Sequence, residues 1–335
     1  MENYSVLSLF SGCGGLDLGF QGGFTSLNNH YKRNPYNIIW ANDIDANACQ
    51  TYRKNLKHTI VCGDIRVIIA QQHNNLFDSP IPNSADIVLG GFPCQDFSQA
   101  GKRRGFESKR GTLYQAMSEV IKRTAPLVFL AENVKGLLTI NNGSAMDQII
   151  NDFTALGYHI SYKLLLTADF DVPQKRERVI IIGTRKDILP IFDFQQLLSG
   201  KSANWISLET AIGDLENSKE GDFINHYWSK AKKNKGQGNN AVSKNLPGPT
   251  MRAEHHGNIE FHWNNKRRLS AREAARIQSF PDDFIFYPST SSAYKQIGNA
   301  VPPVFGWYLA RSIYSFLQTN LSGASSENRN LQVSV

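Results

Sequence analysis

Short apolar runs alternate with amphipathic stretches from the start of the chain to about Asp187. A short apolar run bounded by polar residues is typical of a strand buried on both faces, whereas apolar positions recurring every three or four residues indicate a helix. Helices are predicted at 45–56 and 113–123. Strands are predicted at Val6–Phe10, Ile38–Ala41, Ile60–Cys62, Asp86–Gly90, Leu127–Ala131 and Val179–Gly183.

This alternation predicts an α/β fold. Strands separated by helices imply right-handed crossovers, and such crossovers cover both faces of a sheet with helices. We therefore expect a Rossmann-like domain with a mixed, mostly parallel sheet.

The pattern fades between Asp187 and about Asn265, where Asn, Gly, Lys and Ser dominate and predict loops. Regular patterning returns in a short helix, before which Ser270 and Glu273 have the spacing of a capping box. A last helix is predicted at 303–318. We expect a cofactor-binding domain at 1–187 and 290–320, a smaller irregular domain at 188–289, and a flexible tail at 321–335.

The composition is that of a folded protein, with 41% hydrophobic and 19% charged residues. No apolar run reaches the roughly 18 residues of a membrane helix, and the chain does not start like a signal peptide, so a cytoplasmic protein is predicted. The four cysteines at 13, 49, 62 and 94 show no CxxC spacing and no accompanying histidine cluster. We expect neither a metal site nor disulfides.

The net charge of +7 is concentrated in one segment. Between Lys230 and Arg276 there are eleven Lys and Arg against three Glu, so the rest of the chain is close to neutral. A basic segment of this kind favours binding to a polyanion. A solvated basic loop is the alternative.

A glycine-dense turn follows the first predicted strand, at Phe10–Gly15 (FSGCGG). Such a turn lets a ligand approach the backbone, although it also forms in proteins without a ligand. Asp43 and Asp64 follow the next two strands and could hold the ribose and the amino group of a nucleoside. Each could instead be a loop acid or a helix cap. Together the three strand ends predict a nucleoside pocket.

Three further polar groups stand next to predicted strands. Cys94 follows Pro93 in a turn at the end of a strand, where parallel sheets bind ligands, although a lone cysteine is more often an inert buried residue. Glu132 ends another strand, and Arg178 begins the last one. Each of these two could be half of a structural ion pair.

Seven motifs follow one another along the chain: Phe10–Gly15, Gly91–Gln95 (GFPCQ), Glu132–Val134 (ENV), Gln174–Arg178 (QKRER), Arg268–Glu273 (RLSARE), Gln278–Asp282 (QSFPD) and Gln296–Pro302 (QIGNAVP). In order and spacing they resemble the signature motifs of the C5-cytosine DNA methyltransferases of bacterial restriction–modification systems. The resemblance covers residues from Phe10 to about Leu317.

The resemblance implies an S-adenosylmethionine-dependent methyltransferase domain that methylates carbon 5 of a cytosine flipped out of double-stranded DNA. Cys94 would attack carbon 6 as a thiolate, because carbon 5 alone is a poor nucleophile. By the same resemblance Glu132 donates to ring nitrogen 3 and Arg178 holds the carbonyl oxygen at carbon 2, and Arg176 and Asn133 complete the predicted catalytic set. The base that removes the carbon 5 proton is not identified.

The implied cofactor contacts include Asp43, where many family members carry the longer Glu. Cys13 occupies a variable position in the turn and receives no catalytic role. The full set is Phe10, Ser11, Gly12, Cys13, Gly14, Gly15, Asp43, Ile44, Asp64, Ile65, Gly91, Pro93, Leu113, Asn299 and Ala300.

Residues 98–110 resemble the family's mobile loop over the site, and 187–265 correspond to its target-recognition region. His255, His256 and Trp263 could also face a groove, but a surface loop is the commoner place for paired histidines. The predicted DNA contacts are Gln95, Ser98, Lys102, Arg103, Arg104, Lys232, Lys233, Arg252 and Arg268.

We expect a monomer that acts at the bacterial nucleoid, pairs functionally with a restriction endonuclease without forming a stable complex, and needs no membrane. A related branch methylates tRNA, but its Cys-Phe-Thr tripeptide is absent. A catalytically dead DNA- or cofactor-binding protein would be expected to lack Cys94. A nicotinamide-dependent oxidoreductase would carry GxGxxG in the first turn.

Overall fold

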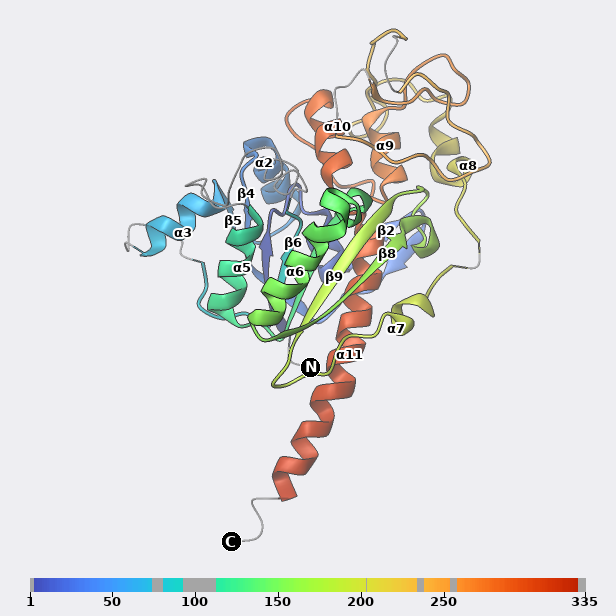
Figure 1. The fold of residues 1–335 in the computed structure, drawn as a ribbon. Helices are drawn as coiled ribbons and strands as arrows, with labels where there is room; N and C mark the ends of the chain where they lie inside the picture. Colours follow the sequence, from blue (N-terminus) through green and yellow to red (C-terminus); the bar gives the residue numbers. More distant parts are fainter. Residues whose placement is uncertain are drawn as a thin grey trace.

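A seven-stranded sheet with helices on both faces forms the centre of the molecule (Figure 1). Its strands lie in the order β5-β4-β1-β6-β7-β9-β8. They are β1 Tyr4–Leu9, β4 Tyr36–Asp43, β5 Ile60–Cys62, β6 Ile87–Gly90, β7 Val128–Val134, β8 Tyr158–Leu166 and β9 Glu177–Arg185, while β2 Phe24–Ser26 and β3 Asn29–Tyr31 form a separate antiparallel pair. This computed structural model describes residues 3–73, 81–92, 113–202, 204–233, 238–253 and 258–330, and only the backbone of 72–73 and 322–330.

The prediction of a mixed, mostly parallel sheet is confirmed. Neighbours among β5, β4, β1, β6 and β7 run parallel, and β9 runs antiparallel to both β7 and β8. Only Thr167–Arg176 separate β8 from β9, which is too short for the crossover that a parallel pair needs. All six predicted strands are present. The pattern did not indicate β8, because this edge strand is only half-buried and exposes Tyr162 and Lys163.

Side chains from alternate strand positions enter two hydrophobic cores, one on each face of the sheet. Val6 packs in one core and Leu7 in the other. The first core is covered by α1 (Gly15–Gln21), α2 (Ala46–Asn55) and α11 (Pro303–Asn330), and the second by α3 (Ile65–His73), α5 (Leu113–Thr124) and α6 (Ser144–Ala155). The fold therefore has three layers.

Helix α11 returns the end of the chain to the first domain, as predicted, and packs against α1. A methyl group on Gly19 would lie 2.4 Å from the carbonyl oxygen of Pro303, so only glycine permits this crossing. The predicted end of the helix was wrong: we expected it near Gln318, and it continues to Asn330. Residues 319–330 contain no proline, and a helix already formed on the core elongates at little cost.

Most of the predicted irregular region, residues 188–289, lies at one end of the molecule, whereas its first helix, α7, lies beside α11 (Figure 1). Its helices are short, and isolated bridges such as Trp228↔Ser270 replace strands in the parts that the structure describes. The helices are α7 Gln195–Leu198, α8 Leu208–Ile212 and α9 Ala271–Ile277, and α10 Thr290–Asn299 follows the region. The 3₁₀ helices among the described residues are Lys135–Leu138, Ile140–Gly143, Thr167–Phe170 and Gly213–Leu215. The predicted capping box of α9 is confirmed, because Ser270 Oγ accepts from Glu273 N–H and the Glu273 side chain accepts from Ser270 N–H.

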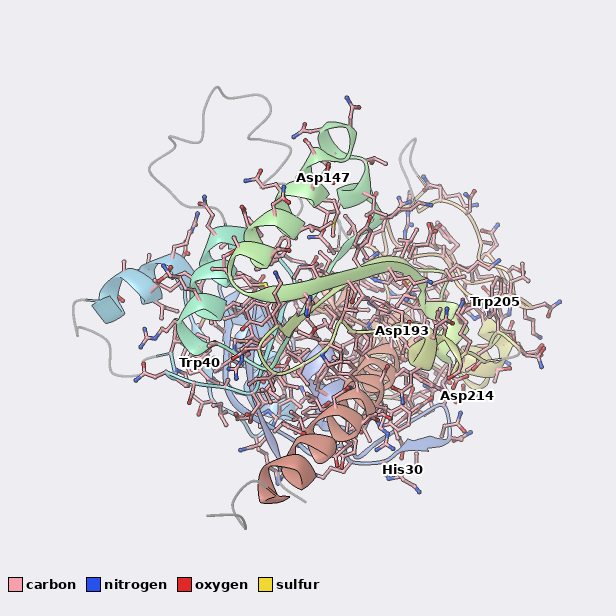
Figure 2. The ribbon with its side chains drawn as sticks, turned by 60° about the horizontal axis from the view of Figure 1, so that its bottom comes forward. His30, Trp40, Asp147, Asp193, Trp205 and Asp214 are labelled. Carbon is pink, nitrogen blue, oxygen red and sulfur yellow. The ribbon has the colours of Figure 1, made fainter. Side chains whose placement is uncertain are left out.

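Buried arginines organise this region in place of a sheet. Arg272 donates to the carbonyl oxygens of Ile224, Pro281 and Phe284 at 2.7–2.8 Å. Arg276 lies 2.6 Å from a carboxylate oxygen of Asp214, which lies toward the periphery of the molecule in the view of Figure 2. Guanidinium groups can satisfy several carbonyls at once, which loops without ladders require.

Arg268 belongs to the same scaffold, and its predicted DNA contact is wrong for this arrangement. Its side chain is 1% exposed and donates to carbonyl oxygens of Ala231, Lys232, Gly238 and Ile259. A buried guanidinium with its donors on main-chain carbonyls holds loops together and does not reach a phosphate.

Over the described residues, no helix combines the length and the apolar character that a bilayer crossing requires.

Candidate active site

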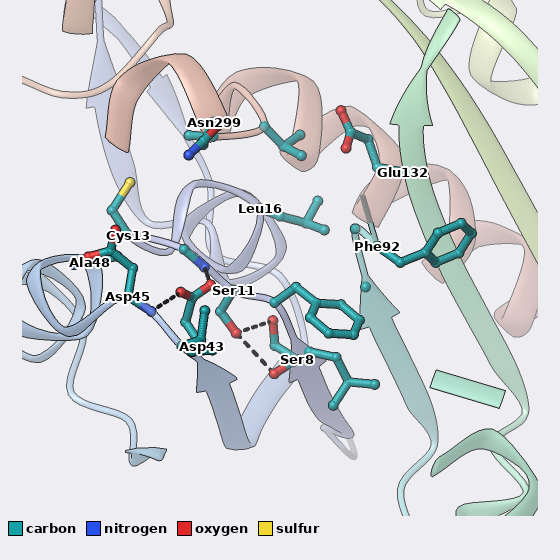
Figure 3. Close-up of a pocket in the computed structure, with 18 of the residues that line it drawn as sticks. Ser8, Ser11, Cys13, Leu16, Asp43, Asp45, Ala48, Phe92, Glu132 and Asn299 are labelled. Atoms are coloured by element: carbon teal, nitrogen blue, oxygen red, sulfur yellow. Dashed lines mark hydrogen bonds between the residues drawn. The ribbon is translucent and has the colours of Figure 1, made fainter. Parts of the chain in front are cut away.

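A cavity of about 530 Å³ lies at the carboxyl ends of the parallel strands (Figure 3). This is where open α/β sheets bind ligands, and the volume suits a nucleoside-sized molecule. Its lining contains residues of the predicted glycine turn, of the acidic strand ends and of the ENV motif. The lining includes Phe10, Ser11, Gly12, Cys13, Asp43, Ile44, Asp64, Ile65, Gly91, Leu113, Glu132, Asn133, Arg176, Arg178, Asn299 and Ala300.

The glycine turn lines the cavity with its first four residues, Phe10, Ser11, Gly12 and Cys13. Phe10 and Gly12 both have φ 56°, in the left-handed region, and nothing lies within 4 Å of a methyl group built on Gly12. Gly14 and Gly15 do not line the cavity. A methyl group on Gly14 would meet Leu56, and one on Gly15 would lie 2.3 Å from the carbonyl oxygen of Val301. The three glycines of the turn therefore serve two purposes: Gly12 keeps the cavity open, whereas Gly14 and Gly15 allow close packing.

Asp43, the last residue of β4, connects this strand to the glycine turn through a hydrogen bond. One carboxylate oxygen accepts from Gly12 N–H and the other from Asp45 N–H, both at 2.8 Å (Figure 3). Each oxygen retains a further lone pair for a ligand. Burial raises the pKa of Asp43, and the two backbone donors oppose that rise. Beside it, Ile44 is 67% exposed and offers an apolar surface at the rim.

Asp64 has a cationic partner that the sequence reading missed. Arg66 lies 2.5 Å from a carboxylate oxygen of Asp64, and this hydrogen bond lowers the pKa of Asp64. Lys295, also at the cavity, pairs with Asp45 at 2.7 Å. The Asp-Ile-Arg spacing was visible in the sequence, but the approach of Lys295 from 250 residues away was not.

The strand that leads to the predicted nucleophile is held by Asn133. Its Nδ2 donates to the carbonyl oxygen of Phe92 at 2.8 Å, and its Oδ1 accepts from Val134 N–H. Asn133 thus positions the backbone directly before Pro93 and Cys94. These two residues lie outside the described residues, as do the predicted DNA contacts Gln95, Ser98, Lys102, Arg103 and Arg104.

Glu132 and Arg178 form an ion pair with each other, which is the alternative role that the sequence analysis gave for each of them. Arg178 Nε lies 2.6 Å from Glu132 Oε1, and the side chains are 10% and 13% exposed. The Nε–H is not directed at that oxygen, so the contact is a charge interaction and not a hydrogen bond. A methyl group on Gly91 would lie 3.5 Å from Glu132 Oε2, which places the carboxylate beside the GFPCQ turn.

Arg176, predicted as a catalytic residue, lines the cavity with Glu132 and Arg178 but directs its hydrogen bonds to three other segments. It donates to the carbonyl oxygens of Met251, Gly298 and Ala300. Burial, together with the nearby Arg178, lowers the pKa of Arg176 to about 9. Because its hydrogen bonds go to main-chain oxygens, we assign it a positioning role.

Two buried glutamines, which the sequence reading did not single out as site residues, extend this scaffold. Gln174 Oε1 accepts from Met251 N–H at 2.9 Å, and Gln174 Nε2 donates to Gln278. Gln278 in turn donates to the carbonyl oxygens of Ile297 and Ala300. Gln174 of QKRER and Gln278 of QSFPD are therefore hydrogen-bonded to each other, and Gln278 joins them to the main chain of QIGNAVP.

The remaining predicted DNA contacts lie in the irregular region. Lys232, Lys233 and Arg252 are exposed. The two lysines line a second hollow of about 360 Å³ whose lining is rich in cations and aromatic rings: Trp228, Ser229, Lys230, Ala231, Lys232, Lys233, Phe261, Lys266, Arg267 and Arg268. The predicted groove residues His255 and His256 lie outside the described residues, whereas Trp263 is half-buried against the core.

Within the described ranges, no group of three or more His, Cys, Asp or Glu side chains is placed to hold a metal ion.

Comparison with known proteins gives a consistent result. The family model for C-5 cytosine-specific DNA methylases matches residues 4–315. The type II methyltransferase M.NgoFVII of Neisseria gonorrhoeae is 38% identical, over 94% of this chain and 87% of its own length. The type II methyltransferase M.FnuDI of Fusobacterium nucleatum is 34% identical, over 92% and 93%. The Dnmt2 methyltransferase of S. pombe shares the fold, with a TM-score of 0.65, 16% identity and coverage of 95% and 99%.

Proposed function

The chain belongs to the C-5 cytosine-specific DNA methylase family and is a DNA cytosine-5-methyltransferase, and we propose that it acts through S-adenosylmethionine and a covalent Cys94–cytosine adduct. One observation carries the proposal: the glycine turn, Asp43 and the Glu132–Arg178 pair line a single cavity. A cofactor bound at the glycine turn and Asp43 would therefore lie next to a cytosine bound at Glu132 and Arg178.

The cavity fits this cofactor. Its volume of about 530 Å³ lies in the range of small-molecule sites. Asp43 has lone pairs left for ribose hydroxyls, and Phe10 and Ile44 supply apolar surface for an adenine ring. We propose that the cofactor contacts are Phe10, Ser11, Gly12, Cys13, Asp43, Ile44, Asp64, Ile65, Gly91, Pro93, Leu113, Asn299 and Ala300. S-adenosylmethionine would supply a methyl group on positively charged sulfur.

The protein's own groups account for the rest of the reaction. The Cys94 thiolate would form a bond to carbon 6 of a flipped cytosine, which makes carbon 5 nucleophilic. Arg178 would turn from Glu132 to the carbonyl oxygen at carbon 2, leaving Glu132 to share a proton with ring nitrogen 3. After methyl transfer, a base takes the carbon 5 proton and Cys94 leaves carbon 6 as a thiolate, which restores the aromatic ring. Asn133 holds the strand from which Cys94 extends.

We propose double-stranded DNA as the substrate and residues 188–289 as the target-recognition domain, set against a catalytic domain of 1–187 and 290–320. The type II relatives support a role in restriction–modification. We propose that methylation protects DNA from a cognate endonuclease, that the methyltransferase is a monomer, and that the two proteins form no stable complex. The activity would then operate on the bacterial chromosome, in the cytoplasm.

Incubation with plasmid DNA and methyl-labelled S-adenosylmethionine tests this function. We expect the label to enter DNA, bisulfite sequencing to find protected cytosines in one sequence context, and a matching restriction enzyme to stop cutting. Label entering tRNA and not DNA would support the RNA-methylating branch instead.

Replacing Asp43 with alanine is expected to weaken cofactor binding by about 1.5–3 kcal/mol, because a charged acceptor is lost. Calorimetry with S-adenosylmethionine measures the affinity. Asp147→Ala, which removes an exposed carboxylate on α6, is the matched control and should leave it unchanged. Affinity that survives Asp43→Ala in a folded protein would contradict the assignment.

Affinity for non-target DNA is expected to fall steeply with salt, because lysines release counterions from phosphates. Replacing both Lys232 and Lys233 with alanine should flatten the slope of log affinity against log salt by about one to two. Lys163 and Lys186, exposed near the β8 edge, provide a control pair. An unchanged slope in the Lys232/Lys233 variant would mean that these lysines belong to a solvated loop.

A further inference from the structure

Asp17 is a buried carboxylate beneath the glycine turn that the reaction described above does not use. It lies on α1, is fully buried, and borders the cavity. One oxygen accepts from Ser8 Oγ at 2.6 Å and the other from the Tyr52 hydroxyl at 2.7 Å. Burying a carboxylate is costly unless something compensates its charge, so its presence here calls for a reason.

The charge balance of the cavity sets Asp17 and Asp43 apart. Five carboxylates line it, at Asp17, Asp43, Asp45, Asp64 and Glu132. The last three each pair with a cation: Lys295, Arg66 and Arg178, at 2.5–2.7 Å. In the described part of the chain, no lysine, arginine or histidine forms an ion pair with either Asp17 or Asp43. Two neighbouring negative charges on one wall are therefore left for a ligand to balance.

The hydrogen bonds of Asp17 also reach the strained part of the turn. Ser8 Oγ, which donates to Asp17, accepts from Ser11 Oγ at 2.9 Å, and Ser11 Oγ also contacts the Ser8 carbonyl oxygen (Figure 3). Between these two serines the chain reaches Phe10, which holds a left-handed φ of 56°. Asp17 is thus connected through Ser8 and Ser11 to the backbone that faces the ligand, so a change in the charge of Asp17 alters the hydrogen bonds that hold this backbone.

The cofactor and its product differ in charge at one atom. S-adenosylmethionine carries a positive sulfur, and S-adenosylhomocysteine, left after methyl transfer, carries a neutral one. Coulomb attraction in a partly desolvated cavity extends over several ångströms without direct contact. We propose that ionised Asp17 makes the cavity select the charged cofactor over the neutral product. This inference rests on the proposed use of S-adenosylmethionine.

The protonation of Asp17 makes the idea measurable. Burial raises the pKa of Asp17 to about 6; the bonds from Ser8 and Tyr52 lower it, and the nearby Asp43 raises it. The other titratable groups facing it are Tyr52 and Cys13, with His58 beyond the Tyr52 hydroxyl at 3.5 Å. Asp17 is protonated below pH 6 and ionised above it. A bound cation favours the ionised form, so affinity for the charged cofactor rises with pH, while affinity for the neutral product does not follow it.

Calorimetry on the full chain, with each ligand between pH 5.0 and 7.5, tests the proposal. For the wild type, the ratio of the product's Kd to the cofactor's Kd is expected to rise about three- to tenfold across this range, with its midpoint near pH 6. Asp17→Asn keeps the shape of the side chain and loses its charge, so its ratio should stay at the low-pH value. A purely structural role would weaken both ligands equally and leave the pH dependence of the ratio intact.

Tyr52→Phe provides a second variant in case Asp17→Asn does not fold. It keeps the carboxylate but removes a hydrogen bond that lowers its pKa, so the midpoint of the ratio should move to higher pH. A ratio that is constant with pH in the wild type overturns the proposal, and so does a rise that Asp17→Asn or Tyr52→Phe leaves unmoved. If neither ligand binds at any pH, the proposed function itself has failed.

Discussion

Cys94→Ser is expected to abolish the covalent complex that the wild-type enzyme forms with S-adenosylmethionine and target DNA carrying 5-fluorocytosine. Fluorine at carbon 5 permits thiol attack and methyl transfer but leaves no proton for the final elimination, so the wild-type adduct accumulates. A serine hydroxyl is far less ionised than a thiol near neutral pH and attacks poorly. Denaturing electrophoresis detects the complex. Methylation of ordinary DNA by the variant should fall by about four orders of magnitude or more.

The other three cysteines are the internal controls for this experiment. Cys13 and Cys49 are buried, and Cys62 is exposed, so Cys62→Ser is the most stringent of the three. Each single replacement should leave the complex intact in a folded protein. The cofactor must also be required, because the thiol adduct reverses before methyl transfer. A wild-type enzyme that methylates DNA yet never traps the fluorinated target would contradict the mechanism, and trapping by Cys94→Ser would move the nucleophile elsewhere.

The parallel strands of the sheet could be predicted because their burial is visible in a few consecutive residues of the sequence. Strands such as Val128–Val134 are buried by helices on both faces, so they appear in the sequence as continuous apolar runs. The edge strand β8 is covered incompletely and mixes Tyr162 and Lys163 with apolar residues, which removes that signal. The acidic strand ends Asp43 and Asp64 were found for the same reason as the strands: each follows directly on a buried run.

Contacts between residues that are far apart in the chain could not be predicted from local sequence patterns. Arg268 and Lys232 both count as positive charges in the basic segment, yet one is buried against carbonyls and the other exposed. Only the fold decides between these fates, because a guanidinium can satisfy main-chain oxygens as well as phosphates. Arg176 and Gln174 illustrate the same limit. The motifs marked them as important, but their contacts with residues 75–124 positions away show that they organise the site.

Glu132→Gln should reduce kcat by about 10²- to 10⁴-fold while leaving cofactor affinity within roughly twofold. An amide fills the same space on β7, so the strand and the Asn133–Phe92 hydrogen bond beside it are retained. It can neither supply a proton to ring nitrogen 3 nor balance the charge of Arg178, which lies 2.6 Å away. Single-turnover methylation at saturating cofactor and DNA isolates the chemical step.

Glu177→Gln is the matched control for this variant. Glu177 stands next to Arg178 on β9 but is exposed, and its carboxylate pairs with the exposed Lys135 at 3.0 Å. Exposed ion pairs contribute little, so this change should alter neither kcat nor stability measurably. Because attack on carbon 6 already builds charge on the ring, Glu132→Gln should also slow trapping of the fluorinated target, not only turnover. An unchanged single-turnover rate in Glu132→Gln, or an equal loss in Glu177→Gln, would exclude Glu132 as the group that stabilises the ring.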